Sequence, residues 1–317
     1  MRRYWIRLGP KKGAFALLQP SLEAKSVLDF RSDSDHPEGR KLIDYEDCGL
    51  GIGNHWAKDL IVDGHAVRCW IRTPRDFPNF YPAIQDAVEK AEAIFVIVSD
   101  PPAVQSVLDQ ITLQLGPNKI VVQSSTISAR WTLQFAEQVR RTGASFLEAP
   151  FTGSKIAAED RQTVYYLGGD TELVERMRPV LEPISSAILH IGPLGTASSL
   201  KLAMNMHIAG IGQILCESLA LCRRSGIPDE VYFEALGRNL AHSGLADLKE
   251  PKLRQHDYSP QFALKHMDKD LRLALETAAD LSLPLDYTRQ LKAIYDQGME
   301  ADWKDDDFIG LVRLLEK

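Results

Sequence analysis

Short apolar runs alternate with amphipathic stretches from residue 41 to residue 192, and this alternation constrains the fold more than any other feature of the chain. The runs are rich in β-branched residues and bounded by turn-forming residues, as buried strands are. The predicted strands are 67–71, 93–99, 119–125, 145–150, 164–167 and 188–191, and the helical stretches between them are 103–115, 129–142 and 171–181. This order predicts an α/β fold with a doubly wound parallel sheet of the Rossmann type.

The pattern changes after Gly192-Pro193, where long helix-forming stretches replace the β-branched runs. The first stretch contains no proline and is apolar around much of its circumference, so it predicts the buried central helix of a second domain. The predicted helices are 197–224, 228–240, 261–281 and 285–298. We therefore expect an N-terminal extension over 1–40, an α/β domain over 41–193 and an all-helical domain over 194–317.

Composition narrows the class of function. The formal net charge is −6 and the pI is about 5.8, which argues against a protein that neutralises nucleic-acid phosphates or anionic lipid. No apolar run approaches the roughly 20 residues that cross a bilayer. We expect a cytoplasmic protein that acts on a small molecule and binds neither nucleic acid nor membrane.

The cysteines and histidines do not form metal-binding patterns. Cys48, Cys69, Cys216 and Cys222 are scattered without a CxxC pair, and no two histidines have the HExxH spacing. We therefore expect reduced cysteines, no disulfide framework and no metal site.

A glycine-rich segment, Gly49-Leu50-Gly51-Ile52-Gly53, precedes a helical stretch at 54–62 and then the strand at 67–71. This order places a pyrophosphate over a helix N-terminus, where a Cβ would block the approach of the backbone. The spacing is GxGxG and not GxGxxG, so an ordinary tight turn is the alternative. Residues 41–48 before it contain three acids, whereas a buried first strand should be apolar. We therefore expect either that this strand is irregular or lost, or that the working protein starts differently from the encoded chain.

Arg72 lies roughly 20 residues past the glycines, where NAD enzymes place an acid on the ribose hydroxyls. A guanidinium can pair with the 2′-phosphate of NADP(H) but offers the ribose hydroxyls of NAD(H) no acceptor. NADP(H) is therefore the preferred cofactor, with NAD(H) possible. The alternative is a solvated arginine at a strand end.

Lys201 and Asn205 lie four residues apart in the long apolar stretch, so their side chains share one face of a helix. A lysine in an apolar helix is costly without partners, which makes it a candidate for a functional site. A lysine that extends its amine to solvent at a helix edge is the alternative.

Several segments together, in order between residues 49 and 285, resemble the β-hydroxyacid dehydrogenase family, which includes 3-hydroxyisobutyrate dehydrogenases and glyoxylate/succinic semialdehyde reductases. The matching motifs are the glycine segment with one residue missing, Ile71-Arg72-Thr73, Ser99-Asp100-Pro101-Pro102, Ser124-Ser125-Thr126, Glu148-Ala149-Pro150-Phe151-Thr152-Gly153-Ser154, Lys201 with Asn205, and Lys269-Asp270 preceded by Phe262.

The resemblance implies a role for each matching position. The catalytic residues are Lys201, as proton donor, and Asn205, which orients the reacting oxygen. The implied cofactor contacts are Gly49, Gly51, Gly53, Arg72, Thr73, Ser99, Asp100, Pro101, Thr126 and Lys269. The implied substrate contacts are Ser125, Thr126, Thr152, Gly153, Ser154, Lys201, Asn205, Phe262 and Asp270.

The implied activity is NADP(H)-dependent reduction of a short aldehyde acid, or oxidation of the corresponding hydroxy acid. The segment 151–160 is most similar to the glyoxylate/succinic semialdehyde reductases. A 3-hydroxyisobutyrate-type dehydrogenase is the nearest alternative. A non-catalytic dinucleotide-binding or scaffold protein is the alternative from another class, favoured by the shortened glycine segment. The long apolar helix predicts a homodimer or a higher homo-oligomer.

Overall fold

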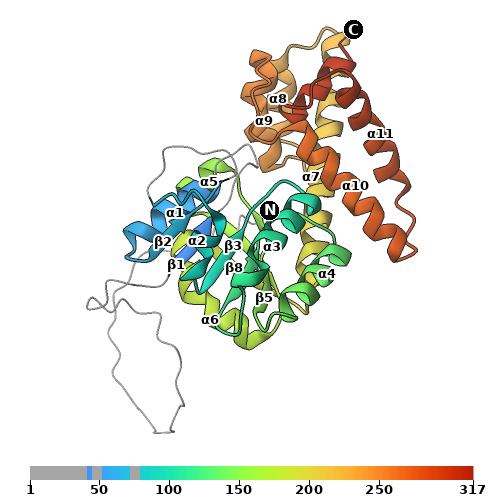
Figure 1. Ribbon diagram of the computed structural model, residues 1–317. Coiled ribbons are helices and arrows are strands. Elements are labelled where there is room, and N and C mark those ends of the chain that lie inside the picture. The colour runs from blue at the N-terminus through green and yellow to red at the C-terminus, as the bar shows by residue number, and fades with distance from the viewer. Residues whose placement is uncertain (1–40, 45–51, 72–78, 317) are drawn as a thin grey trace, which may run out of the picture. The chain divides into compact units, whose positions relative to one another are not determined.

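The computed structural model describes residues 41–44, 52–71 and 79–316. An eight-stranded sheet with flanking helices is followed by a set of helices, as Figure 1 shows. The predicted fold class, a Rossmann-type α/β domain before an all-helical domain, is confirmed.

The described strands pair in the order β2-β1-β3-β4-β5-β7-β6, and β8 pairs with β7. β1 to β5 are parallel neighbours, whereas β7 runs antiparallel to β5 and β6. The strands are β1 (Lys41–Asp44), β2 (Ala66–Cys69), β3 (Ala93–Val96), β4 (Ile120–Gln123), β5 (Ser145–Glu148), β6 (Phe151–Thr152), β7 (Thr163–Gly168) and β8 (Ser185–Gly192).

The first strand forms, although the acids in segment 41–48 led us to expect an irregular or lost strand. β1 lies between β2 and β3, and Leu42 is in register with Val67 on one side and Ala93 on the other. It ends at Asp44, before the other two acids of the segment. Because the chain leaves β1 toward β2 and later returns to β3 on the opposite side, the sheet has a switch point at β1. Ligands of such sheets bind beyond the carboxyl ends of the strands at this point.

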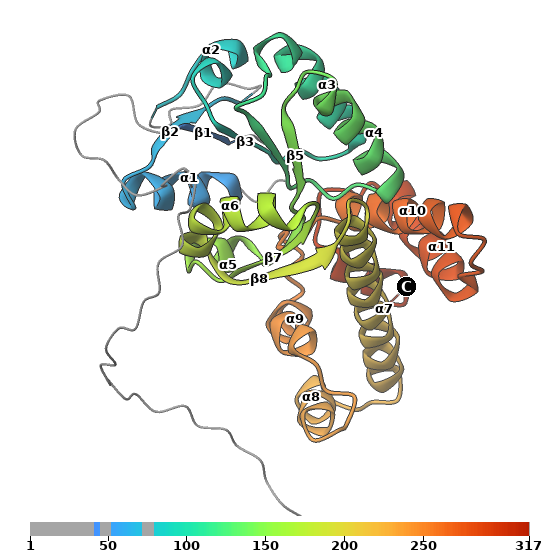
Figure 2. The same ribbon diagram turned by 90° about the horizontal axis from the view of Figure 1, so that it is seen from below.

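Helices cover both faces of the sheet. In Figure 2, α2, α3 and α4 lie on one face and α1, α5 and α6 on the other. β3 and β4 are buried along their whole length, as expected for strands between two helical layers. The elements are α1 (Ile52–Val62), α2 (Ile84–Glu89), α3 (Pro101–Ile111), α4 (Ala129–Arg140), α5 (Lys155–Glu159), α6 (Thr171–Leu181) and the 3₁₀ turns η1 (Thr112–Gln114) and η2 (Glu182–Ile184).

The helical part is organised around α7, a helix of 29 residues that spans about 40 Å. α8 and α9 pack on its C-terminal half, and α10 and α11 run along another side. The sequence analysis did not predict α9. The elements are α7 (Thr196–Arg224), α8 (Asp229–Gly237), α9 (Gly244–Gln255), α10 (Leu264–Asp280), α11 (Asp286–Glu300) and η3 (Phe308–Leu314).

α7 is less buried than its apolar sequence predicts. Leu202 and Leu219 are buried, but Ile214 and Leu221 are 57% and 69% exposed. One face of this long helix is therefore exposed in the chain as described. Among the described residues, no helix is both long and apolar enough to span a membrane.

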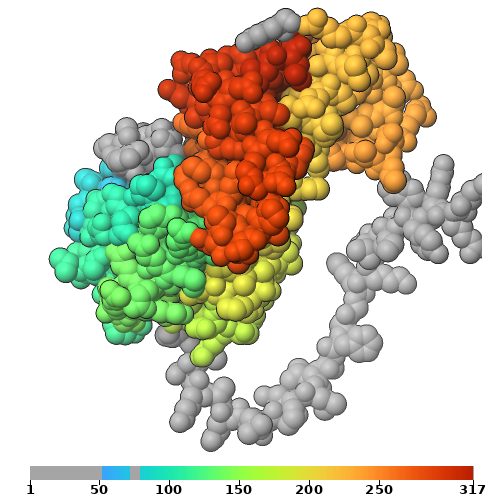
Figure 3. Space-filling view, turned by 90° about the vertical axis from the view of Figure 1, so that its right-hand side faces the viewer, coloured from blue at the N-terminus to red at the C-terminus, as the bar shows by residue number. Residues whose placement is uncertain are grey.

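The α10 helix also contacts the α/β part of the chain. Arg130 of α4 forms an ion pair with Asp280 at the end of α10. Figure 3 shows the orange-red surface of the late helices against the green surface of the α/β part. The carboxyl ends of the strands therefore face side chains from the helical part.

Candidate active site

A cavity of about 310 Å³ lies between the carboxyl ends of the strands and the start of α7. Segments 124–126, after β4, and 152–154, after β6, line it from the sheet side, together with Ile52 at the start of α1. Lys201 and Asn205 of α7 line it from the helical side, together with Phe262. Eight of the predicted site residues, spread over about 140 positions of sequence, therefore surround one cavity: Ser125, Thr126, Thr152, Gly153, Ser154, Lys201, Asn205 and Phe262.

Asn205 is held by a buried carboxylate. Its Nδ2 donates a hydrogen bond of 2.6 Å to Oδ2 of Asp270, and the side chains of both residues are almost fully buried. This bond fixes the orientation of the amide, because only the amide nitrogen can donate to a carboxylate. Asp270 was predicted as a substrate contact, but it lines neither cavity and instead contacts the lining residue Asn205.

Lys269 joins the helical side to the sheet side. Its Nζ lies 2.9 Å from Oδ1 of Asp270 and donates a hydrogen bond of 2.8 Å to the carbonyl oxygen of Thr126. A chain of polar contacts therefore runs from Asn205 on α7 through Asp270 and Lys269 on α10 to the segment that follows β4. The contact of Lys269 with Asp270 is an ion pair without hydrogen-bond geometry, because Oδ1 has no hydrogen-bond partner among the described residues.

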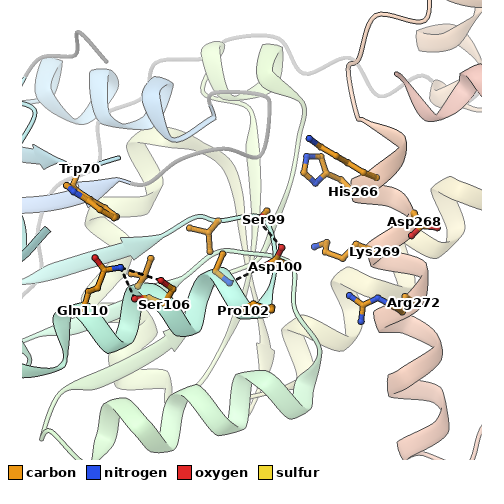
Figure 4. A pocket seen from close by; sticks show the side chains of 14 residues that line it. Trp70, Ser99, Asp100, Pro102, Ser106, Gln110, His266, Asp268, Lys269 and Arg272 are labelled. Atoms are coloured by element: carbon orange, nitrogen blue, oxygen red, sulfur yellow. Dashed lines mark hydrogen bonds between the residues drawn. The ribbon is translucent and has the colours of Figure 1, made fainter. Parts of the chain in front are cut away.

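A second, larger cavity of about 780 Å³ adjoins Lys269 and is shown in Figure 4. Trp70 at the end of β2 and Ser99 and Asp100 after β3 line it on the sheet side. Lys269 and Arg272 of α10 line the opposite side. This cavity lies beyond β2 and β3, beside the switch point of the sheet. That position, with the cations of Lys269 and Arg272 facing it, fits a dinucleotide with its phosphates. The remaining lining residues include Pro102, Ser106, Gln110, Lys265, His266 and Asp268.

Ser99, Asp100 and Pro101 form the start of α3. Asp100 Oδ1 accepts the N–H of Ala103 at 2.9 Å, and Oδ2 accepts the hydroxyl of Ser99 at 3.1 Å. Asp100 is thus the N-cap of the helix, and the buried Pro101 takes the first helical position, where no N–H is needed. Ser99 and Asp100 line the larger cavity, but Pro101 does not.

The hydroxyl of Ser125 is engaged between two strands. Ser125 Oγ accepts the N–H of Val98 at 2.7 Å and donates to the carbonyl of Val96 at 3.3 Å. Ser124 lies beside it on the cavity wall, is 1% exposed, and its Oγ has no hydrogen-bond partner among the described residues. The sequence motif gave no reason to prefer Ser124, because both positions carry the same side chain.

The segment after β6 combines a necessary glycine with engaged hydroxyls. Gly153 has a φ of +137°, and a Cβ there would lie 3.1 Å from Cβ of Ala157. Both facts require glycine. Ser154 Oγ caps α5 by accepting the N–H of Ala157 at 3.4 Å, and the Thr152 hydroxyl bonds to the phenol of Tyr166. The backbone of this segment is therefore fixed at the cavity edge.

Four predicted cofactor contacts, Gly49, Gly51, Arg72 and Thr73, lie outside the described residues. Gly53 is described and is buried in the first turn of α1. Among the described residues, no cluster of histidine, cysteine and acidic side chains could hold a metal ion, and Cys216 and Cys222 are free thiols.

Lys249 was not predicted as a site residue, yet it lines the smaller cavity. Its side chain is 1% exposed, and Nζ donates to Oδ2 of Asp307 at 2.9 Å and to Oε1 of Gln261 at 3.0 Å. Burial lowers the pKa of the Lys249 amine, and the charge of Asp307 opposes this effect. Lys249 lies on α9, and the N-cap Ser243 was the sequence signal for this helix. Pro251 inside the helix and the many charged residues around it obscured that signal.

Comparisons with known proteins agree with this geometry. Residues 48–192 match the family model described as the NAD binding domain of 6-phosphogluconate dehydrogenase. Residues 195–315 match the model described as NAD-binding of NADP-dependent 3-hydroxyisobutyrate dehydrogenase. The two models together cover the α/β part and the helical part.

Similar proteins cover most of the chain. Glyoxylate/succinic semialdehyde reductase 2, chloroplastic, of Arabidopsis thaliana is 26% identical over 84% of this chain and 78% of its own length. An uncharacterised oxidoreductase of Synechocystis is 30% identical over 74% of this chain and 86% of its own length. The structure of 3-hydroxyisobutyrate dehydrogenase of Mycobacterium tuberculosis with L-serine has the same fold, with a TM-score of 0.79 and 22% identity over 88% of this chain and 100% of that one. The chain belongs to the β-hydroxyacid dehydrogenase family of NAD(P)-dependent oxidoreductases.

Proposed function

We propose that this protein reduces the carbonyl group of a short aldehyde acid with NADPH and that Lys201 is the proton donor. The observation that carries the proposal is the common cavity: Lys201 and Asn205 line it from α7, opposite the segments that follow β4 and β6. An amine in this place faces a carbonyl held at the carboxyl ends of the strands. Oxidation of the corresponding hydroxy acid is the same reaction in reverse.

Lys201 acts as a general acid in this proposal. Its ammonium group hydrogen-bonds the carbonyl oxygen and transfers a proton as negative charge develops there. Asn205 donates its second Nδ2 hydrogen to the same oxygen, and its bond to Asp270 keeps the amide in this orientation. Lys201 would thus supply the proton, and Asn205 would orient the carbonyl oxygen that receives it.

The substrate carboxylate is assigned to the segment after β6. Thr152, Gly153 and Ser154 stand at the cavity edge, and the positive φ of Gly153 allows backbone N–H groups to approach an anion. Thr126 closes the same side, and Phe262 limits the space available beyond the reacting carbon. We assign Ser125 the task of fixing the Thr126 segment, since its hydroxyl bonds to β3.

The larger cavity suits the cofactor. A nicotinamide dinucleotide supplies the hydride that reduces the carbonyl carbon when it is bound. Ser99 and Asp100 would meet its ribose. Lys269, which lines the larger cavity and bonds to Thr126 on the wall of the smaller one, would meet the nicotinamide end. We propose that the glycines Gly49, Gly51 and Gly53 receive the pyrophosphate and that Arg72 and Thr73 receive the 2′-phosphate of NADP(H).

Arg72→Ala tests the cofactor preference. We expect the Michaelis constant for NADPH to rise by on the order of 10-fold or more, because a charge-assisted contact to the 2′-phosphate is lost, while that for NADH hardly changes. Steady-state kinetics with both cofactors measure this. Equal effects on both cofactors would show that Arg72 does not recognise the phosphate.

The relatives suggest the substrate. The names of the Arabidopsis reductases point to glyoxylate or succinic semialdehyde, and that of the structural neighbour to 3-hydroxyisobutyrate. We favour a short aldehyde acid because of segment 151–160. A turnover screen of glyoxylate, succinic semialdehyde and 3-hydroxyisobutyrate with both cofactors decides between them.

Three further points belong to the proposal. We place the boundary between the two domains at residues 193–194, between the two matching family models. We propose a homodimer or higher homo-oligomer, supported by the exposed Ile214 and Leu221 on α7 and Val231 on α8. We also propose a cytoplasmic location, supported by the free thiols of Cys216 and Cys222.

Lys201→Ala tests the central claim. We expect turnover to fall by about 10²- to 10⁴-fold, the usual contribution of a general acid, with the dissociation constant for NADPH within about 2-fold of the parent. The control is Lys304→Ala, which removes an exposed amine that lines neither cavity. Normal turnover of the Lys201 variant would refute the proposed role. NADPH binding by the parent without turnover of any substrate in the screen would support the non-catalytic alternative.

A further inference from the structure

The carboxylate of Glu148 lies at the N-terminus of α7. Glu148 is the last residue of β5 and is fully buried. Its Oε2 accepts the N–H of Gly195 at 2.7 Å, and its Oε1 accepts the N–H of Ser198. An acid from the middle of the sheet therefore binds the first turn of the helix that carries Lys201 and Asn205.

This arrangement replaces an ordinary helix cap. The first turn of a helix has N–H groups without intrahelical partners, and the residue before the helix usually satisfies one of them, as Asp100 does for α3 and Ser243 for α9. The residue before α7 is Gly195, which has no side chain and a φ of +93°. Glu148, which lies 47 residues earlier, supplies the acceptor instead.

The surroundings of Glu148 accommodate its carboxylate closely. Gly168 is its partner on β7, and a Cβ at that position would overlap with Oε2. The Ser198 hydroxyl also bonds to Glu148, and Oγ1 of Thr132 on α4 lies 2.8 Å from Oγ of Ser198. Since the Ser198 hydroxyl donates its hydrogen bond to the carboxylate, the Thr132 hydroxyl is the donor in the bond to Ser198 Oγ. The end of α7 is thereby connected to β5, β7 and α4.

The position of Lys201 depends on this connection. Lys201 follows Ser198 by three residues, or about 4.5 Å along the helix axis, and Asn205 lies about one turn further. A helix transmits a shift or tilt at its first turn to these side chains. Misplacement of a reacting group by about 1 Å is enough to reduce turnover substantially.

We propose that Glu148 is a positioning residue, which holds the first turn of α7 against the sheet and thereby places Lys201 and Asn205 against the substrate carbonyl; this inference rests on the proposed function of Lys201. The same carboxylate opposes the positive end of the helix dipole. Burial raises the pKa of Glu148, while its bonds to Ser198, Gly195 and Ala197 oppose the rise. A buried carboxyl group costs stability in its ionised form, and these hydrogen bonds offset part of that cost.

Glu148→Gln and Glu148→Asp test the inference together. Gln keeps the size but loses the charge and presents an N–H₂ group to one of the two backbone donors. We expect Gln to lower kcat by about 10- to 100-fold, the effect of losing hydrogen bonds to a charged acceptor, with the dissociation constant for NADPH within about 2-fold of the parent. Asp keeps the charge with a shorter reach, and we expect it to retain more of kcat than Gln does.

Two further measurements separate positioning from a merely structural role. The primary isotope effect on kcat/KM with C4-deuterated NADPH should rise in the Gln variant, because the hydride step becomes slower than the other steps. Amide hydrogen exchange over 195–199 should become faster, because the acceptor of these N–H groups is weakened. The matched control is Lys119→Met, which removes a cap of three carbonyl bonds at the end of α2, away from both cavities.

Each outcome has a definite meaning. A Gln variant with kcat within 2-fold of the Lys119→Met control, or with an unchanged isotope effect, would overturn the inference. A Gln variant as active as the Asp variant would also overturn it, because the charge would then be irrelevant. Normal turnover of Lys201→Ala would instead refute the proposed function. The exchange measurement needs no turnover, and unchanged protection over 195–199 would overturn the capping role by itself.

Discussion

The sheet-side wall of the smaller cavity consists of segments that follow β4 and β6, whereas side chains from α7, α9 and the 261–262 segment form much of the helix-side wall. Hydroxyl groups on the sheet side mostly bond to neighbouring strands of the same sheet, as Ser125 does with Val96 and Val98. Polar and charged groups on the helix side bond between different helical elements. Lys249 reaches Asp307, and Asn205 reaches Asp270.

This difference suggests that the two walls of the cavity have different functions. Local bonds to strands make the sheet side a rigid surface, and its shape changes little when one of them is lost. The contacts of the helix side link α7, α9, α10 and η3, so each depends on the placement of the others. We therefore expect substitutions on the helix side to act mainly on turnover, and loss of a hydroxyl group from the sheet-side wall to act mainly on stability.

Asp270→Asn should have the larger effect, because it breaks the helix-side network at its centre. The substitution removes the negative charge that accepts from Asn205 at 2.6 Å and pairs with Lys269 at 2.9 Å. We expect kcat to fall by about 10- to 100-fold, as for other lost bonds to a charged group. Steady-state kinetics and NADPH titration measure this. If the free energy of unfolding fell while kcat stayed unchanged, Asp270 would act on stability, as we expect of the sheet-side hydroxyl groups. The proposed difference between the two sides would then be contradicted.

Ser125→Ala and Ser124→Ala sharpen the comparison at two neighbouring positions. Loss of the Ser125 hydroxyl removes its buried hydrogen bonds to Val98 and Val96, so we expect the free energy of unfolding to fall by about 1–2 kcal/mol with KM nearly unchanged. Ser124 has no described partner for its hydroxyl, and its loss should cost little stability. Chemical denaturation and substrate kinetics measure both variants. A 10-fold rise in KM for Ser125→Ala without destabilisation would mean that this hydroxyl binds substrate, as its motif implied.

Much of the fold was predictable from the sequence because its elements follow the local apolar pattern. β3 and β4 are continuous apolar runs, and α7 is a long stretch without proline, so their types followed from periodicity. β1 was misjudged because its acids were counted as part of the strand, which in fact ends at Asp44. α9 was missed because Pro251 and a row of charges interrupt its pattern.

The site was predictable only where a motif carried it. Lys201 and Asn205 were found because their spacing and the family resemblance agreed. The buried partners Lys249 and Asp307 are 58 residues apart, and nothing in the sequence indicates that they meet. Glu148 belonged to a recognised motif, but its contact with the first turn of α7 depends on how β5 approaches the helix. Such contacts are properties of the tertiary structure.

The pH dependence of stability gives the finest test of the comparison, since each side contains a buried ionisable group. Burial raises the pKa of Glu148 in the folded protein, so the folded state binds this proton more tightly than the unfolded state does. The resulting contribution to the free energy of unfolding is complete below the ordinary pKa of 4.5 and is lost as the pH rises through the folded-state pKa. Burial lowers the pKa of Lys249, so its linkage has the opposite sign: its stability is present above the ordinary pKa of 10.5 and is lost as the pH falls.

The measurement is urea denaturation of the parent and of Glu148→Gln between pH 4.5 and pH 8. The parent should lose stability relative to the variant as the pH rises, by about 1.4 kcal/mol for each unit by which the pKa of Glu148 differs between the folded and unfolded states. Glu159→Gln, at an exposed position on α5, is the control and should run parallel to the parent. A parent that gains stability over the Gln variant across this range would mean that the helix N–H groups outweigh burial. Glu148 would then be an ordinary helix cap whose ionised form stabilises the folded protein.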